Sequence, residues 1–372
     1  MESQRVAIVY DWIDKWGGVE RLLLVLHELF PQADWYTSYY DQKGASWFRN
    51  SISSNSGRHV LHTSFIQRLP SAIKKNRIAS LLLYPYAFEA FDFSAYDTVI
   101  SVSSSFAKCV ITKPSTRHIC ILLTPTRFLW SHADAYISPG IMSTFARPFL
   151  TSLRRWDIIA AQRPDNLFAI SQAVVDRCNK YYHRKAELLY PPFDYTYWHE
   201  KASHPLPSSF LSHNNNRGDY FLLVSRLEKY KKIELAIKTF NTLPDKHLIV
   251  VGKGSQQRYL HSIANDNISF FHDSSDDDLA SLYHHAQALI MPQEEDFGYV
   301  ALEAQACGCP VIAYSKGGAL ETVQNGTFYH HQTITSLKKA IILNSKTEHT
   351  SSFNPEAFSL GTFKETIIQA VK

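Results

Sequence analysis

The stretch PQEEDFGYVALEAQACGCPVIA, residues 292–313, predicts a loop, a helix and a strand in succession. The preceding run ALIMP, residues 288–292, is typical of a buried strand, and apolar residues then recur at nearly a 3.6-residue period until Gly308. Glu295 therefore falls in a strand-to-helix loop, and Glu303 falls in the second turn of the helix. A first helical turn has unpaired backbone N–H groups and partial positive charge, which suit a phosphate or a sugar hydroxyl. The two acids are thus predicted to flank a polar ligand at a helix start.

Short apolar runs alternate with helical patterns along the whole chain, which indicates parallel sheets built from βα units. The predicted strands are RVAIVY, DWYTSY, DTVISV, RHICIL and NLFAIS in the first half, and YFLLVSRL, HLIVVG, ISFFH, ALIMP and PVIAYS in the second. Amphipathic helices are predicted at 18–30 and 171–182. The predicted fold class is α/β, with two doubly wound, Rossmann-like domains facing across a cleft. Ligands of such sheets bind beyond the carboxyl ends of the strands.

Length and composition indicate two domains. A chain of 372 residues with 45% apolar and 19% charged residues is globular and too long for one ordinary core. Residues 191–219 are rich in Pro, Ser, Asn and aromatic residues without a sustained period, which predicts a linker. This division gives an N-terminal domain over 1–190, a C-terminal domain over 220–350, and a final helix over 351–372. We expect that helix to pack back towards the N-terminal domain.

The cysteines and the apolar runs indicate the compartment. The five cysteines, at 109, 120, 178, 307 and 309, are odd in number and lack zinc spacing, so reduced cytosolic thiols are expected. The N-terminus has no signal-peptide pattern, and no run of about 20 apolar residues could span a membrane. We expect a cytoplasmic protein, with the cytoplasmic face of the inner membrane as a second location.

Charge is distributed unevenly along the chain. Up to residue 195 there are 22 Lys and Arg against 16 Asp and Glu, a net +6, and the remaining 16 against 18 give −2. A helix over 63–91 would place Arg68, Lys74, Lys75 and Arg77 beside an apolar face, which suits an anionic bilayer surface. The competing interpretation is that the apolar face packs onto its own domain and the basic edge is merely solvated. Nucleic acid is not expected, because it usually requires denser basic clusters.

Two cations and several glycine pairs follow predicted strands. Arg226 and Lys231 lie five positions apart across a predicted turn, where two cations can clamp a diphosphate and stabilise it as a leaving group. Closely spaced glycines allow the backbone to approach a phosphate, although a plain turn explains them equally well. These glycines are Gly17 with Gly18 and Gly252 with Gly254. A further pair, Gly317 with Gly318, precedes a predicted helix start.

These motifs resemble family 4 glycosyltransferases of the GT-B fold, over essentially the whole chain and in the same order. The residues that carry the resemblance are Gly17-Gly18-Val19-Glu20, Arg226 with Lys231, Gly252-x-Gly254, and Glu295-Asp296-Phe297-Gly298 followed by Glu303-Ala304. The segments at 91–114 and 124–130, the latter reading TPTRFLW, further resemble a mannosyltransferase-like branch of bacterial O-antigen and exopolysaccharide assembly.

The resemblance implies a retaining hexosyltransferase and assigns a role to each motif. Arg226 and Lys231 would neutralise the departing diphosphate, and Glu303 would hold the ribose hydroxyls. Glu295 would hold sugar hydroxyls, with Arg226, Lys231 and Glu295 forming the catalytic set. The further donor-binding residues would be Gly17, Gly18, Gly252, Gly254, Phe297, Gly298 and Tyr299, and Thr124 and Arg127 would lie on the acceptor or sugar side.

The resemblance also implies the substrates. GDP-mannose is the preferred donor within the class of GDP- and UDP-hexoses, and the acceptor would be a saccharide or lipid-linked saccharide of surface polysaccharide or lipopolysaccharide synthesis. Peripheral contact with an anionic membrane is expected, and nucleic acid is not. No metal cofactor is expected, since no Asp-x-Asp follows a predicted strand. The acidic run at 276–278 is better explained by capping at a helix start.

Leu123 departs from this branch, which commonly has a histidine there. Leucine cannot form a side-chain hydrogen bond, so a nucleotide-sugar-binding protein with impaired transfer is the alternative function. A glycoside hydrolase would need Glu295 and Glu303 about 5–10 Å apart across a bond, and a nucleotide-sugar epimerase would need further acids and a histidine. The nearby His118 and His132 are expected to be structural or exposed.

Overall fold

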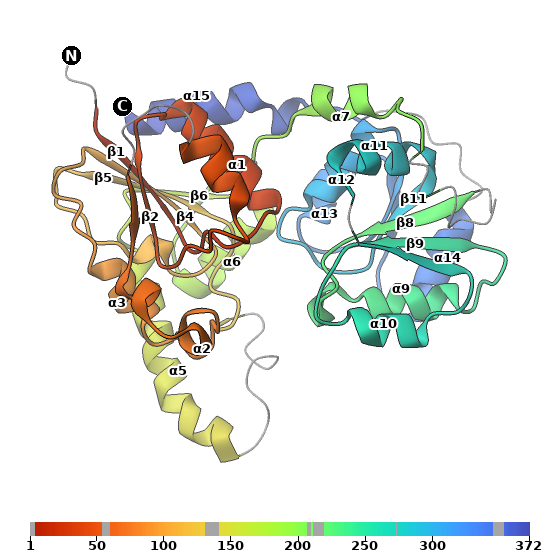
Figure 1. Ribbon diagram of the computed structural model, residues 1–372, viewed down its shortest axis with the longest axis horizontal. Coiled ribbons are helices and arrows are strands. Elements are labelled where there is room, and N and C mark those ends of the chain that lie inside the picture. Colours follow the sequence, from red (N-terminus) through yellow and green to blue (C-terminus); the bar gives the residue numbers. More distant parts are fainter. Residues whose placement is uncertain are drawn as a thin grey trace. The chain divides into compact units, whose positions relative to one another are not determined.

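The protein folds into two compact α/β units. The computed structural model describes residues 4–53, 60–130, 141–206, 210, 219–272, 274–344 and 353–372. Unit 1 comprises Met1–Pro192 with Gly361–Lys372, and unit 2 comprises Phe193–Leu360 (Figure 1). The predicted fold class of two Rossmann-like domains is confirmed.

Unit 1 is built on a parallel sheet of seven strands in the order β3-β2-β1-β4-β5-β6-β7. Its central strands are buried along their whole length, as expected of a parallel sheet covered on both faces. The strands are β1 (Val6–Tyr10), β2 (Asp34–Thr37), β3 (Leu61–Thr63), β4 (Thr98–Ser103), β5 (Arg117–Leu122), β6 (Asn166–Ala169) and β7 (Glu187–Leu188).

The α-helices of unit 1 are α1 (Gly18–Leu29), α2 (Ser71–Lys74), α3 (Tyr84–Glu89), α5 (Ile141–Ala160), α6 (Gln172–Tyr182) and most of α15 (Leu360–Val371). Three short turns of other helix types are η1 (Phe48–Ser53), η2 (Phe65–Arg68) and η3 (Ala107–Cys109). The final helix is tied to this unit by an ion pair of 2.8 Å between Lys364 Nζ and Glu28 Oε1. Arg117 also donates to the carbonyl oxygen of Ala370 at 2.8 Å.

Unit 2 contains a second parallel sheet, with strand order β10-β9-β8-β11-β12-β13. The strands are β8 (Tyr220–Val224), β9 (His247–Val251), β10 (Ile268–Phe271), β11 (Ala286–Met291), β12 (Val311–Tyr314) and β13 (Gly326–Tyr329). The helices are α7 (Tyr195–Lys201), η4 (Lys229–Lys231), α9 (Ile233–Phe240), α10 (Gln257–Ile263), α11 (Asp276–His285), α12 (Tyr299–Ala306), α13 (Ala319–Thr322), α14 (Ile334–Asn344) and η5 (Glu356–Phe358).

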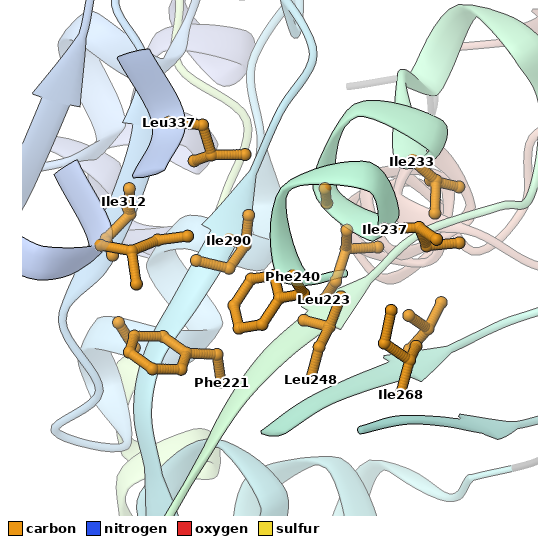
Figure 2. Packing of buried hydrophobic residues seen from close by; sticks show 14 of the residues in the cluster. Phe221, Leu223, Ile233, Ile237, Phe240, Leu248, Ile268, Ile290, Ile312 and Leu337 are labelled. Atoms are coloured by element: carbon orange, nitrogen blue, oxygen red, sulfur yellow. The ribbon is translucent and has the colours of Figure 1, made fainter. Parts of the chain in front are cut away.

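The core of unit 2 shows why these segments become helices and strands. Ile233, Ile237 and Phe240 recur at helical spacing along α9 and point into a cluster with strand residues such as Leu223 and Leu248 (Figure 2). Figure 1 shows α9 and α10 on one side of this sheet, and α11 and α12 on the other. Both faces of the strands are therefore covered, as in a doubly wound fold.

The prediction of one continuous amphipathic helix over 63–91 is wrong. The segment contains only η2, α2 and α3, joined by turns. Leu69 is extended because the ring of Pro70 disfavours helical backbone before it, and the Asn76 side chain accepts from Ile78 N and Ala79 N in a turn. No continuous basic edge forms.

The basic residues of this segment also contact acids of their own unit. Arg77 pairs with Asp14 at 2.7 Å and lies over the Trp12 ring at 4.2 Å from its centroid. Lys75 pairs with Asp41 at 3.4 Å. Among the helices of the described residues, none is long and apolar enough to cross a membrane.

Other sequence predictions agree with the structure, with a few exceptions. All ten predicted strands are present, whereas β3, β7 and β13 were missed because they are short and show no clear period. The five cysteines are free, as predicted, and the structure adds that all of them are buried. The predicted linker contains α7, whose Lys201 pairs with Asp277 of α11, while residues 207–209 and 211–218 lie outside the described part of the chain.

The carboxylate of Asp11 ties together the two central strands of unit 1. Asp11 follows β1 and is fully buried. Its Oδ2 accepts from Ser104 N, Ser104 Oγ and Ser105 N at 2.6, 2.9 and 2.9 Å. Its Oδ1 accepts from Phe106 N and Ala107 N, both at 2.7 Å. A buried carboxylate needs such donors. Because these donors all follow β4, the Asp11 carboxylate links the carboxyl ends of β1 and β4, where the strand order reverses.

We expect Asp11→Ala to destabilise the protein strongly, because it leaves several buried N–H groups without an acceptor. Each such group costs about 1–3 kcal/mol. Asp92→Ala is the matched control, since Asp92 accepts from Ser94 N at 2.8 Å in an exposed turn. Thermal unfolding of both variants checks this expectation. Equal unfolding temperatures for the two variants would contradict the role given to Asp11.

Candidate functional site

The strand order of unit 2 brings two distant loops to one place. From β8 the chain continues outward to β9 and β10, and from β11 it continues to β12 and β13, so the direction reverses between β8 and β11. These two strands are neighbours and parallel, and their carboxyl ends therefore lie at the same edge. The crevice at such a reversal is where open α/β sheets bind ligands. Arg226 and Lys231 follow β8, and Glu295 follows β11.

Lys231 and Glu295 are in contact at this crevice. The Lys231 ammonium forms an ion pair and a hydrogen bond with Glu295 Oε1. Gln293 Nε2 donates to the same oxygen at 2.6 Å. The side chains of Lys231 and Glu295 are only 11% and 14% exposed. The structure thus joins two predicted site residues and adds Gln293, which the sequence analysis missed because an isolated glutamine carries no motif.

Arg226 lies on the exposed side of the same loop. Its guanidinium donates to the Tyr230 hydroxyl at 2.7 Å. The loop is anchored by Glu228, whose carboxylate accepts from Ser255 N at 3.1 Å and Ser255 Oγ at 2.5 Å. Leu227 N also donates to Lys253 O at 2.8 Å. Both predicted cations therefore sit on one loop that is fastened to the loop after β9.

Gly252 and Gly254 allow the loop after β9 to pack closely against the loop after β8. A Cβ at Gly252 would lie 2.0 Å from Ser225 O, and one at Gly254 would lie 2.4 Å from Leu227 O. These glycines are required where two strand-end loops pack backbone to backbone. Beside them, a pocket of about 630 Å³ is lined by Gly254, Ser255, Gln257, Arg258 and His261.

The loop that carries Glu295 is held by the glycines after β12. Gly318 N donates to Glu295 O at 2.8 Å, and a Cβ at Gly317 would lie 2.2 Å from that oxygen. Gly317 precedes α13, as predicted, and its φ of +71° favours glycine. Glu295 is consequently fixed through its backbone as well as through its side chain.

Phe297, Gly298 and Tyr299 form the entry to α12. Gly298 is the N-cap with a φ of +98°, a conformation that favours glycine. Phe297 is buried and packs edge-on against Tyr299 and Phe358, with ring centroids 5.1 and 5.8 Å apart. The helix thereby begins beside Glu295 and presents its N-terminal turn at the strand-end edge of the sheet.

Glu303 lies in the second turn of α12, as predicted, and is buried. The hydroxyl of Tyr283 in α11 donates to Glu303 Oε2 at 3.1 Å. Burial, and then the charge of Glu303, raises the pKa of Tyr283 well above its usual value, so the phenol remains a donor. Tyr283 was missed from the sequence, where it appears as one more apolar residue of a helix.

Gly17 and Gly18 of unit 1 lie at the start of α1, as expected. Gly17 is its N-cap, and a Cβ there would lie 3.1 Å from Glu20 Oε2. Glu20 is buried, accepts from the Tyr10 hydroxyl at 3.2 Å, and has its pKa raised by burial. The buried carboxylate of Glu20 therefore lies at the start of this helix. In the sequence, Glu20 was visible only as the last residue of the Gly17-Gly18-Val19-Glu20 motif.

Thr124 and Arg127 flank a buried polar network of unit 1. Thr124 is buried, and Arg127 is half-buried. Between them, Thr126 Oγ1 lies 3.0 Å from Asp157 Oδ1. That carboxylate pairs with Lys108 at 2.7 Å, and both side chains are fully buried. This network holds the loop after β5 and was missed, because nothing in the sequence pairs Lys108 with Asp157.

Neither Leu123 nor His118 supplies a histidine that could contact a ligand, because the first side chain is apolar and the second is structural. Leu123 is buried, and its N–H continues the strand pairing to Ser103 O at 2.8 Å. His118 lies within β5, where its Nε2 is 2.8 Å from Ser101 Oγ, and burial lowers its pKa to about 3. His118 is therefore structural, as predicted, and His132 lies outside the described residues.

A family model matches most of the residues of unit 2. Residues 209–357 match the family model described as glycosyl transferases group 1. The match covers 149 of the 372 residues. Within the parts of the chain that the structure describes, no group of three or more His, Cys, Asp or Glu could hold a metal ion.

Curated relatives match short segments of the chain. An uncharacterized glycosyltransferase of Methanocaldococcus jannaschii is 33% identical over 113 residues, which is 28% of this chain and 29% of the relative. A GDP-mannose-dependent monoacylated α-(1-6)-phosphatidylinositol monomannoside mannosyltransferase of Corynebacterium glutamicum is 34% identical over 116 residues, 28% of this chain and 30% of the relative. The matched segments span less than a third of these relatives.

Solved structures match nearly the full length. Anabaena HepE in complex with UDP and glucose superposes with a TM-score of 0.68 at 17% identity, covering 99% of both chains. Sucrose-phosphate synthase of Thermosynechococcus elongatus gives 0.67 at 17% identity, covering 99% of this chain and 95% of its own. The predicted GT-B fold is confirmed by this likeness.

We expect Gly317→Ala to lower the unfolding temperature more than Gly308→Ala. Both glycines have positive φ, of +71° and +81°, so both variants carry backbone strain. Only at Gly317 does the new Cβ meet another backbone, since nothing lies within 4 Å of a Cβ at Gly308. Thermal unfolding of the two purified variants provides the comparison. A similar loss in both would show that the loop of Glu295 does not depend on this contact.

Proposed function

We propose that the protein is a retaining hexosyltransferase of glycosyltransferase family 4 that uses a nucleotide sugar as donor. The observation that carries this proposal is the contact of Lys231 with Glu295 at the strand-order reversal of a group 1 domain. A cation for a diphosphate and an acid for a sugar are adjacent there, as a nucleotide sugar requires.

In this proposal each described side chain has one task. Arg226 and Lys231 stabilise the negative charge that grows on the departing diphosphate, and no metal cofactor is invoked. Glu303, oriented by Tyr283, accepts hydrogen bonds from the ribose hydroxyls. Glu295 accepts from hydroxyls of the hexose, next to the N–H groups at the start of α12.

The proposed donor is GDP-mannose, and UDP-glucose is the main competitor. The Corynebacterium relative is named as GDP-mannose-dependent, which supports the first donor. HepE was solved with UDP and glucose, which favours testing the second. The proposed acceptor is a saccharide or lipid-linked saccharide of surface polysaccharide synthesis, bound on the unit that carries Thr124 and Arg127.

A nucleotide-sugar-binding protein without efficient transfer is the second candidate. It is motivated by Leu123, which offers no side-chain hydrogen bond near the loop after β5. Incubation with labelled GDP-mannose and UDP-glucose distinguishes the two functions. Slow donor hydrolysis or transfer supports the transferase, whereas binding without turnover supports the second candidate.

Replacing Arg226 or Lys231 with Ala should reduce turnover about a hundredfold or more, because each charge acts on the leaving group. Lys229→Ala is the matched control, since it removes an exposed cation from the same loop. Initial rates of donor hydrolysis, measured beside unfolding temperatures, separate loss of function from loss of fold. If Arg226→Ala or Lys231→Ala behaves like Lys229→Ala, the diphosphate assignment is wrong.

Peripheral membrane binding, which we propose to occur at the cytoplasmic face, would rest on apolar side chains rather than on a basic helix edge. Ile78, Leu82 and Tyr86 are 60%, 42% and 67% exposed within one short segment of unit 1, and such side chains suit a bilayer interface. We expect Ile78→Ser with Leu82→Ser to weaken co-sedimentation with anionic vesicles at low salt. Leu343→Ser, at a 58% exposed site of unit 2, is the control.

Wild-type protein that ignores anionic vesicles even at low salt would refute this membrane proposal. A soluble saccharide would then be the better acceptor candidate. Binding that persists in the double variant but disappears at high salt would instead assign the contact to charge.

A further inference from the structure

Glu295 lies where it must influence any anion that binds Lys231. The carboxylate touches the Lys231 ammonium, so a phosphate oxygen bound to the same ammonium is placed within a few ångströms of Glu295. Two negative charges at that separation repel each other. The repulsion is poorly screened, because both side chains are largely buried.

Glu295 cannot easily move away from such an anion. Gln293 Nε2 donates to its Oε1 at 2.6 Å, and Gln293 itself is buried. The backbone of Glu295 is held by Gly318 N at 2.8 Å and by the close approach of Gly317. The carboxylate is therefore a fixed negative charge beside the ammonium.

A hexose attached to the diphosphate changes this balance. Its hydroxyl groups can donate to the carboxylate, and hydrogen bonds to a charged acceptor are stronger than those between neutral groups. A nucleoside diphosphate without its sugar brings the repulsion but no such donor. Discrimination between two ligands often depends on a repulsive element of this kind.

We propose that Glu295 is a specificity-determining residue that disfavours a nucleoside diphosphate lacking its sugar, and so selects the intact donor over the product. This inference rests on the proposed function. In transfer, the bond between the anomeric carbon and the diphosphate oxygen breaks, and the diphosphate keeps the electron pair. The acceptor hydroxyl oxygen forms the new bond to the anomeric carbon, and its proton passes to the departing diphosphate oxygen. The remaining diphosphate then faces Glu295 without compensation, which favours its release.

The test compares Glu295→Gln with Glu294→Gln. Both substitutions remove one negative charge at nearly constant shape, but Glu294 is exposed, whereas Glu295 contacts Lys231. Calorimetry at low salt gives the Kd values of GDP, UDP, GDP-mannose and UDP-glucose for each protein. Glu295→Gln should bind the matching diphosphate about tenfold or more tightly than wild type. It should bind the complete donor no more tightly, and Glu294→Gln should resemble wild type.

Glu295→Ala and Glu295→Asp keep the test decisive. Glu295→Ala removes the charge by truncating the side chain and should also tighten diphosphate binding. This variant replaces Glu295→Gln in the test if the Gln variant folds poorly. Glu295→Asp keeps the charge and should not tighten it. If no folded neutral variant binds the diphosphate more tightly than wild type, the inference is overturned. If wild type binds none of the four ligands, the proposed function fails and the inference fails with it.

Discussion

Close packing between the strand-end loops of unit 2 is the constraint on which the site depends. Cβ atoms at Gly252, Gly254, Gly317 and Gly318 would each lie 2.0–2.5 Å from a backbone oxygen of a neighbouring loop. Only glycine allows these loops to meet without a side chain between them. The glycines after β9 hold the loop after β8, and the glycines after β12 hold the loop after β11. Because β8 pairs with β11, the two loops held in this way lie side by side, and Lys231 contacts Glu295.

The two units use the same strand-order reversal for different purposes. In unit 1, the reversal lies between β1 and β4, and the carboxylate of Asp11 takes the backbone N–H groups that follow β4. In unit 2, the reversal carries Lys231, Glu295 and the start of α12. In the first reversal, the buried carboxylate of Asp11 thus accepts the hydrogen bonds of these N–H groups and has a structural role. The second reversal instead carries an ion pair whose two side chains keep 11% and 14% of their surface exposed.

Buried polar partners orient the acids of the candidate site. Tyr283 donates to Glu303, and Gln293 and Lys231 donate to Glu295. A carboxylate whose rotamer is held in this way presents its charge in a defined direction, which recognition of sugar hydroxyls requires. The same logic explains Lys108 and Asp157 in unit 1, whose buried pair holds the loop between Thr124 and Arg127.

The sequence by itself determined the fold class, ten of the strands, and the placement of Arg226, Lys231, Glu295 and Glu303 at strand ends and in a helix. Hydrophobic periodicity carries that information, because buried strands and amphipathic helices leave a regular pattern. Hydrophobic periodicity failed over 63–91, where the ring of Pro70 disfavours helical backbone at the preceding residue. Only the tertiary structure decided which side chains meet. Lys231 and Glu295 are 64 residues apart, and the pairing of β8 with β11, which leaves no local pattern in the sequence, brings their loops together.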